Sequence, residues 1–302
     1  MTDRREFLAG AAALTMTASS PLAIAVEPSA LPRRAIPGTD DSLPVIGLGN
    51  SAAFRQGDFE TSRRVISTLH EYGGAYVDCM GPSRFVVAEA ATDLGVANDL
   101  FLGTYFTGAD DTLARVDAEK LKQATGKPVL DLMHNYPEDA APHWDTFRAW
   151  KDDGLTRYIG VSRHRKEAYP TMIEMMKTGT VDILQVNYSL LETEAEKEVL
   201  PLAMDLGVAV TINRPFINGR FFALIRKEPL PKWAVEFDCE SWAQFSLKFI
   251  LSHPAVNCVL TETANPRHAV DNVRAGFGRL PDDAMRKRML AHIQELVAKG
   301  ST

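Results

Sequence analysis

Val129-Leu-Asp-Leu-Met-His-Asn-Tyr-Pro137 is the stretch that decides the fold. It begins as a buried strand, because four of its first five residues are apolar and they follow the breaker Gly126-Lys-Pro128. It then presents His134, Asn135 and Tyr136 in a row. Where strands and helices alternate, polar groups at the carboxyl end of a strand lie where such folds carry their chemistry. The plain structural alternative is a core strand that ends in a hydrogen-bonded histidine.

The same alternation of strand and helix runs through the rest of the chain. Besides the opening stretch, apolar strands are expected at residues 45–49, 75–77, 100–104, 157–161, 183–187, 208–212 and 257–260. Eight strands, each followed by a helix, predict an α/β fold of one domain, a (β/α)8 TIM barrel. A doubly wound open sheet is the alternative, but Gly47-Leu-Gly49 is followed by Asn50-Ser-Ala-Ala, which lacks the third glycine of a dinucleotide fingerprint.

Composition excludes several classes of partner. The chain has 302 residues, 45% of them hydrophobic, and a formal charge of −6 with no basic cluster in its body. Nucleic acid and anionic membranes are therefore poor partners, and we expect a small-molecule substrate. The histidines are scattered, and neither Cys-x-x-Cys nor His-x-x-x-His occurs. No metal site is expected.

The amino end resembles a twin-arginine export signal. Thr2-Asp-Arg-Arg-Glu-Phe-Leu8 holds the arginine pair, a weakly apolar run follows, and Ala23-Ile-Ala25 resembles a cleavage site. The run is too short and too mild for a stable membrane anchor. The resemblance implies a signal peptide at residues 1–25, a linker at 26–34, a barrel at 35–302, passage through the twin-arginine export machinery and a periplasmic location. Three cysteines in that oxidising compartment allow one disulfide.

Several later segments resemble the aldo-keto reductase family. Gly154-Leu-Thr-Arg-Tyr-Ile-Gly-Val-Ser162 is similar to the family's fifth-strand segment, and Gln185-Val-Asn-Tyr-Ser189 to its sixth strand. Arg214-Pro-Phe216 is similar to the end of its seventh strand, and Asn265-Pro-Arg-His-Ala-Val-Asp-Asn272 to its last cofactor-binding helix. The resemblance implies hydride transfer between a nicotinamide dinucleotide and a carbonyl, with a tyrosine as proton donor helped by lysine, aspartate and histidine.

This sequence keeps half of that catalytic set. Asp78 matches the family's aspartate and His134 its histidine, whereas no tyrosine follows in the shortened loop Cys79-Met-Gly-Pro82 and Tyr105 stands in place of the lysine. The expected catalytic residues are therefore Asp78, His134 and Tyr105, with Tyr105 as substitute proton donor and His134 polarising the carbonyl oxygen. Without a lysine, the pKa of Tyr105 is expected near its reference value of about 10. A tyrosine that packs at the barrel mouth with its hydroxyl in water is the structural alternative.

The resemblance also implies a set of cofactor contacts, with NADP or NAD as the cofactor. Ser162 and Gln185 match residues that hold the nicotinamide amide, and Asn213 stands where an aromatic ring usually stacks. Glu262 stands where a basic residue is common, which leaves the choice between NADP and NAD open. The expected cofactor-binding residues are Ser162, Arg163, Gln185, Asn213, Arg214, Arg267, His268 and Asn272.

Two other functions stay open at this point. A barrel without redox chemistry would bind, or do acid–base chemistry on, an anionic or sugar-like ligand, with Arg163 and Arg214 as anion clamps. An adaptor protein would use residues 214–240, where three prolines break regular structure. The aromatic residues considered there are Phe216, Phe221, Phe222 and Trp233. Aromatic residues at this density more often form a lid over the barrel mouth.

Overall fold

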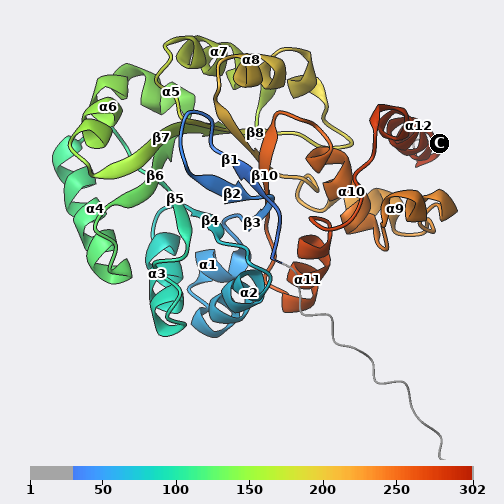
Figure 1. Ribbon diagram of the computed structural model, residues 1–302, viewed down its shortest axis with the longest axis horizontal. Helices are drawn as coiled ribbons and strands as arrows, with labels where there is room; N and C mark the ends of the chain where they lie inside the picture. Colours follow the sequence, from blue (N-terminus) through green and yellow to red (C-terminus); the bar gives the residue numbers. More distant parts are fainter. Residues whose placement is uncertain (1–29, 301–302) are drawn as a thin grey trace, which may run out of the picture.

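Eight parallel strands close into a barrel in the computed structural model, which describes residues 30–300 (Figure 1). Neighbouring strands follow in chain order, and the last strand pairs with the first, which closes the barrel. This arrangement confirms the predicted single-domain (β/α)8 fold. The strands are β3 (Ile46–Leu48), β4 (Tyr76–Cys79), β5 (Phe101–Tyr105), β6 (Leu130–Asn135), β7 (Thr156–Arg163), β8 (Ile183–Asn187), β9 (Ala209–Asn213) and β10 (Val256–Thr261).

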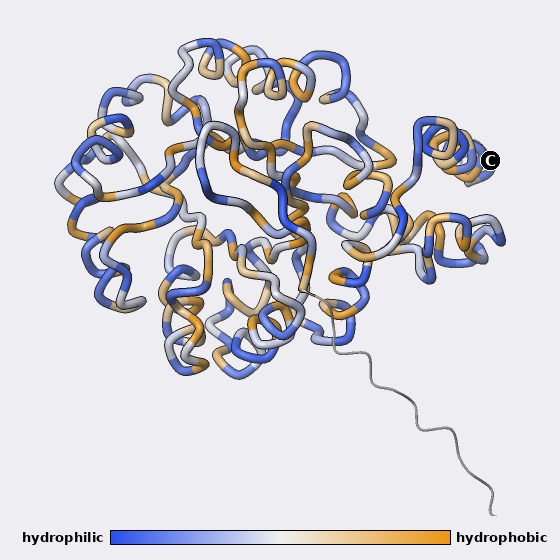
Figure 2. The backbone as a smooth tube through the Cα atoms, in the orientation of Figure 1, coloured by the Kyte–Doolittle hydropathy of each residue, from blue (hydrophilic) through white to orange (hydrophobic). Residues whose placement is uncertain are grey.

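Helices surround the barrel because each has one apolar face to bury. In α2, for example, the buried face holds Val65, Ile66 and Leu69, and Asp58 caps the first turn. Figure 2 shows the same pattern, with apolar residues on the strands and hydrophilic ones on outer turns. The helices are α1 (Ala52–Gln56), α2 (Phe59–Glu71), α3 (Ser83–Asp93), α4 (Asp111–Thr125), α5 (Pro137–Ala140), α6 (Trp144–Asp152), α7 (Tyr169–Lys177), α8 (Val199–Asp205), α9 (Arg220–Ile225), α10 (Trp242–Leu251), α11 (Pro266–Arg274) and α12 (Asp283–Gly300).

A short hairpin covers the amino-terminal end of the barrel. Strands β1 (Arg33–Ala35) and β2 (Ser42–Pro44) pair antiparallel, and their apolar side chains Ile36 and Leu43 join the cluster inside the barrel (Figure 1). Strand β1 begins at Arg33, two residues before the expected start of the barrel at residue 35. The hairpin covers this end, whereas a cavity is lined by residues at the carboxyl ends of the strands.

The long connection between β9 and α10 contains α9 and a 3-10 helix, η4 (Lys232–Phe237). Its aromatic residues pack against α10, where Trp242 lies edge-on to Phe221 with centroids 6.1 Å apart. Cys79, Cys239 and Cys258 are buried and free, so the disulfide that the sequence allowed does not form among them. Within residues 30–300, no helix is long and apolar enough to span a bilayer. The predicted export signal lies outside the described residues.

Candidate active site

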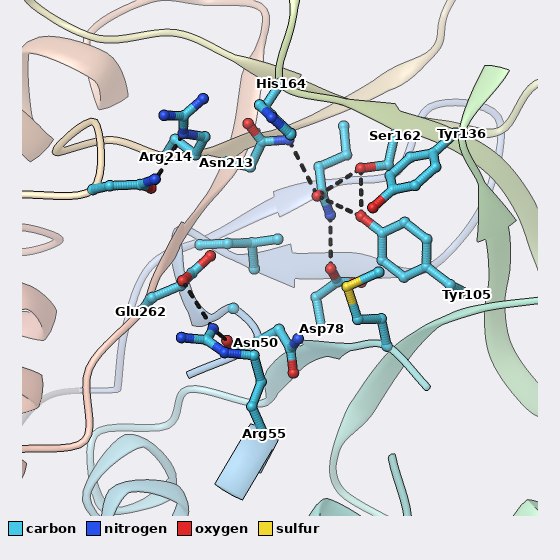
Figure 3. Close-up of a pocket in the computed structure, with 15 residues that line it drawn as sticks. Asn50, Arg55, Asp78, Tyr105, Tyr136, Ser162, His164, Asn213, Arg214 and Glu262 are labelled. Carbon is cyan, nitrogen blue, oxygen red and sulfur yellow. Dashed lines mark hydrogen bonds and ion pairs between the residues drawn. The ribbon is translucent and has the colours of Figure 1, made fainter. Parts of the chain in front are cut away.

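A cavity of about 280 Å³ opens at the carboxyl ends of the strands (Figure 3). Five strands place a polar side chain in its wall, because the last residues of parallel strands meet at one rim of a barrel. This inner cavity is lined at those strand ends by Asp78 (β4), Tyr105 (β5), Ser162 (β7), Gln185 (β8) and Asn213 (β9). The sequence predicted all five as site residues, and the structure brings them together.

A directional chain of hydrogen bonds joins four of these residues. Gln185 Nε2 donates to Asp78 Oδ2 at 3.0 Å, which fixes the orientation of the amide and leaves Gln185 Oε1 as an acceptor. Ser162 Oγ donates to that oxygen at 2.8 Å. The Tyr105 hydroxyl then donates to Ser162 Oγ at 2.7 Å. The phenol is therefore held at the cavity wall with its proton turned toward Ser162.

His134 lies next to Asp78 but beneath the cavity. Its Nε2 is 2.8 Å from Asp78 Oδ1, in an oblique contact that leaves neither atom with an aligned hydrogen-bond partner. The predicted convergence of a carboxylate and an imidazole is thus confirmed. His134 is fully buried, however, and the ring of Tyr105 covers it, with ring centroids 4.2 Å apart. The predicted direct contact between His134 and a substrate oxygen is wrong, because Tyr105 stands between them.

The pKa of Tyr105 is raised well above its usual value. Burial is the main cause, and the negative charge of Asp78 adds to it, while the hydrogen bond with Ser162 opposes it. The prediction of a pKa near the reference value was wrong, because it considered the missing lysine and not the loss of water around the phenol. At neutral pH the phenol of Tyr105 is therefore protonated, and it can donate its proton only to a strong base.

Two neighbours fix this arrangement from behind. Gly103 lies so close to Asp78 that a Cβ at this position would stand 2.5 Å from Asp78 Oδ1. Arg84 is buried, donates to the carbonyl oxygen of Tyr105 at 3.1 Å and pairs with Asp117 at 2.8 Å. A side chain at residue 103 would displace the carboxylate, so glycine is required there for steric reasons.

Positive charge gathers on one wall of the inner cavity. Arg214 has a left-handed backbone, with φ of 51°, and its Nε donates to Asn218 Oδ1 at 3.2 Å. Its guanidinium has no carboxylate partner among residues 30–300. The pKa of His164 is lowered by burial and by the charges of Arg214, Arg163 and Arg165. This side of the cavity is suited to a negatively charged ligand group.

Arg163 was predicted to contact the cofactor, but the structure places it away from the cavity. Its guanidinium lies over the ring of Tyr136, 4.0 Å from the centroid, and forms an ion pair with Glu138. These contacts neutralise the charge and turn the side chain toward α5. Arg163 therefore neither binds in the cavity nor acts as the anion clamp considered above.

Two further hollows continue the inner cavity toward α11. The middle pocket shares Arg55, Arg214, Asn218 and Glu262 with the inner cavity. The outer pocket shares Phe216, Phe222 and Glu262 with the middle pocket and reaches His268 and Asn272 on α11. Arg267 lines none of the three. The result is one groove that runs from Tyr105 to α11.

A family profile described as the aldo/keto reductase family matches residues 124–289. The chain belongs to the aldo/keto reductase family. The fold agrees with solved members: an aldo-keto reductase from Bacillus halodurans in its holo form has a TM-score of 0.69 at 21% identity, over 88% of this chain and 96% of that one. An aldo/keto reductase from Klebsiella pneumoniae in complex with NADP and acetate has a TM-score of 0.66 at 20% identity, over 90% and 95%.

A relative of established activity matches only in part. The NADH-specific methylglyoxal reductase of Escherichia coli (strain K12) is 31% identical over 81 residues. The match covers 27% of this chain and 24% of that protein, so it spans about a quarter of the relative's length.

Within this aldo/keto reductase, several cavity-lining residues had no predicted role. Asn50 and Arg55 follow the first strand, and their position at a strand end was the signal that sequence reasoning passed over. Tyr136 was noticed beside His134 but given no role, although it lines the cavity 5.5 Å from the ring of Tyr105. Met80, in the segment after β4, also lines the cavity.

Proposed function

We propose that this protein is an NAD(P)H-dependent reductase of small aldehydes or ketones in which Tyr105 supplies the proton. The observation that carries the proposal is the Tyr105 hydroxyl, held in the cavity wall by Ser162 and linked through Gln185 to Asp78. Support comes also from the family, from the relative named as an NADH-specific methylglyoxal reductase and from the structural neighbour solved with NADP.

The inner cavity fits the nicotinamide end of a dinucleotide. The side-chain oxygens of Asn50 and Asn213 are buried and have no hydrogen-bond partner among the described residues. Both residues line the cavity. A buried acceptor without a donor costs about 1–3 kcal/mol of free energy. The two amide hydrogens of a bound nicotinamide carboxamide would satisfy these two acceptors and remove that cost. Arg55 and Arg214, at the junction with the middle pocket, would face the pyrophosphate.

The reaction needs one hydride and one proton. A bound reduced nicotinamide would supply the hydride to the carbonyl carbon, and Tyr105 would pass its hydroxyl proton to the carbonyl oxygen, which yields the alcohol and a tyrosinate. Ser162 then turns its hydroxyl toward the phenolate oxygen until water restores the proton. Asp78 and His134 act as positioning residues, since Asp78 orients Gln185 and His134 packs under the Tyr105 ring.

Titration of the purified protein with NADH and NADPH tests the proposal first. We expect binding of at least one of them at micromolar concentrations, followed by loss of absorbance at the nicotinamide band when methylglyoxal or another small aldehyde is added. Lack of binding of both at millimolar concentration would overturn the proposal. The alternative of a redox-inactive barrel that binds an anionic or sugar-like ligand would then account better for the positive cavity wall.

The export signal remains a proposal of its own, supported by the arginine pair and the Ala23-Ile-Ala25 motif. We propose that the twin-arginine machinery delivers the folded protein to the periplasm. Cell fractionation of a bacterial host tests this, with R4K/R5K as the comparison. Equal recovery of both proteins from the cytoplasm would refute it.

A further inference from the structure

We propose that the outer pocket accepts an adenosine with a free 2′-hydroxyl and rejects a 2′-phosphate, so that the cofactor is NADH rather than NADPH. This inference rests on the proposed function and adds the identity of the dinucleotide. It comes from the chemistry of the groove, which changes along its length.

The outer pocket, of about 330 Å³, has the features of a nucleoside site. Phe216, Phe222 and Trp242 give it aromatic walls, on which a flat base can stack. Asn272 lies in the same wall and is 95% buried, with only 5% of its surface exposed. A carboxamide beside aromatic rings suits the hydrogen-bonding edge of a purine.

Charge in the outer pocket is negative where a phosphate would need positive charge. Glu262 and Asp271 both line it, and Asp271 is fixed by Ser241 Oγ at 2.8 Å and Gln244 Nε2 at 2.7 Å. Carboxylates accept hydrogen bonds from ribose hydroxyls and repel a 2′-phosphate. His268 is the one basic residue in this lining, and it carries no permanent charge.

The basic groups on α11 are turned away from the outer pocket or paired. Arg267 does not line the pocket, and its backbone N–H is capped by Asn265 Oδ1 at 3.0 Å. Arg274 pairs with Glu240 at 3.8 Å. Arg55 lies 3.5 Å from Glu262, and both Arg55 and Arg214 line the inner cavity and the middle pocket but not the outer pocket. The first turn of α11 thus places no guanidinium in the outer pocket. The backbone N–H of Arg267 is already used by Asn265 and is not available to a phosphate.

Glu262 is the residue best placed to discriminate. It lines all three hollows, so a dinucleotide in the groove must pass it. Burial raises the pKa of its carboxyl, and Arg55 opposes this rise. Its side chain is 46% exposed and pairs with Arg55 at 3.5 Å.

Equilibrium binding separates this inference from the proposed function. Fluorescence titrations at one ionic strength, with Trp242 in the pocket as reporter, give Kd for NADH and NADPH. Adenosine 5′-monophosphate and adenosine 2′,5′-bisphosphate repeat the comparison without the nicotinamide. We expect each 2′-phosphorylated ligand to bind at least about tenfold more weakly, as repulsion at a half-exposed carboxylate implies.

Two variants locate the effect. Glu262→Gln should tighten NADPH about tenfold and change NADH less than about threefold. Glu236→Gln makes the same change in net charge at an exposed site paired with Arg288, outside the groove, and should leave the ratio unchanged. Wild-type protein that binds NADPH as tightly as NADH, or an unchanged ratio in Glu262→Gln, overturns the inference while the proposed function stands. If neither dinucleotide binds, the proposed function fails and the inference falls with it.

Discussion

Replacing Tyr105 by phenylalanine tests the centre of the proposal, because it removes one oxygen and keeps the ring over His134. General acid catalysis by a positioned side chain contributes about 10²–10⁴ in rate. We therefore expect kcat for aldehyde reduction to fall at least about a hundredfold. The lost hydrogen bond to Ser162 costs about 1 kcal/mol of unfolding free energy. Ser162 still donates to Gln185 at 2.8 Å, so no donor is left unpaired.

Steady-state kinetics and dinucleotide binding on the same preparations separate chemistry from folding. Tyr105→Phe should lower kcat and leave the Kd of the dinucleotide within about threefold, since the mutation removes the reacting proton rather than the binding groove. Tyr169→Phe is a matched control, because its half-buried hydroxyl bonds Asn187 outside the cavity. A Tyr105→Phe protein that keeps a third or more of wild-type kcat would show that the proton comes from another group.

The pH dependence of the wild-type protein gives a second readout of the same residue. The raised pKa of Tyr105 means that the phenol is protonated throughout the neutral range. Reduction needs the protonated form, so its rate should be flat up to about pH 9. Oxidation of the product alcohol needs the tyrosinate, so its rate should rise by about tenfold per pH unit over that range. A reduction rate that falls by half between pH 7 and pH 9 would contradict the assignment.

Three further predictions concern the fold around the site. Gly103→Ala should abolish most activity and cost about 1–3 kcal/mol of unfolding free energy in denaturant titrations, because the new methyl group would meet Asp78. Ellman's reagent should modify none of the three cysteines in the native protein and all three after denaturation, since each is buried and burial raises its pKa, to about 12 for Cys239. Stability measured by circular dichroism should be constant at neutral pH and fall above about pH 9–10. The reason is that the pKa values of the thiols and of Tyr76 and Tyr105 are raised in the folded protein, so at high pH these groups lose their protons more readily in the unfolded chain, which favours unfolding.

Much of this could be predicted from the sequence, because strand ends and their polar residues are local features. The stretch around His134 predicted both a strand and the side of the barrel that carries the site. The environment of each side chain could not be predicted in the same way. Arg163 follows Ser162 on the same strand, yet it turns outward to Tyr136 and Glu138. That outcome depends on α5, which lies far from Arg163 in the sequence.

The position of Tyr105 has a mechanical consequence for the site. Tyr105, the proposed proton donor, is the last residue of β5. Strand pairing holds it there: Thr104 is in register with Cys79, and Tyr105 with His134. Arg84 adds a hydrogen bond to its carbonyl oxygen.

A side chain on a paired strand is placed more accurately than one on a loop. It also has fewer ways to approach a cation, and none of the groups that shift the pKa of Tyr105 is cationic. Under the proposed function, the site would hold a fixed proton donor that no neighbouring cation makes a stronger acid. Such an acid serves a reduction, in which the oxygen that receives the hydride's charge becomes a strong base and draws the proton itself.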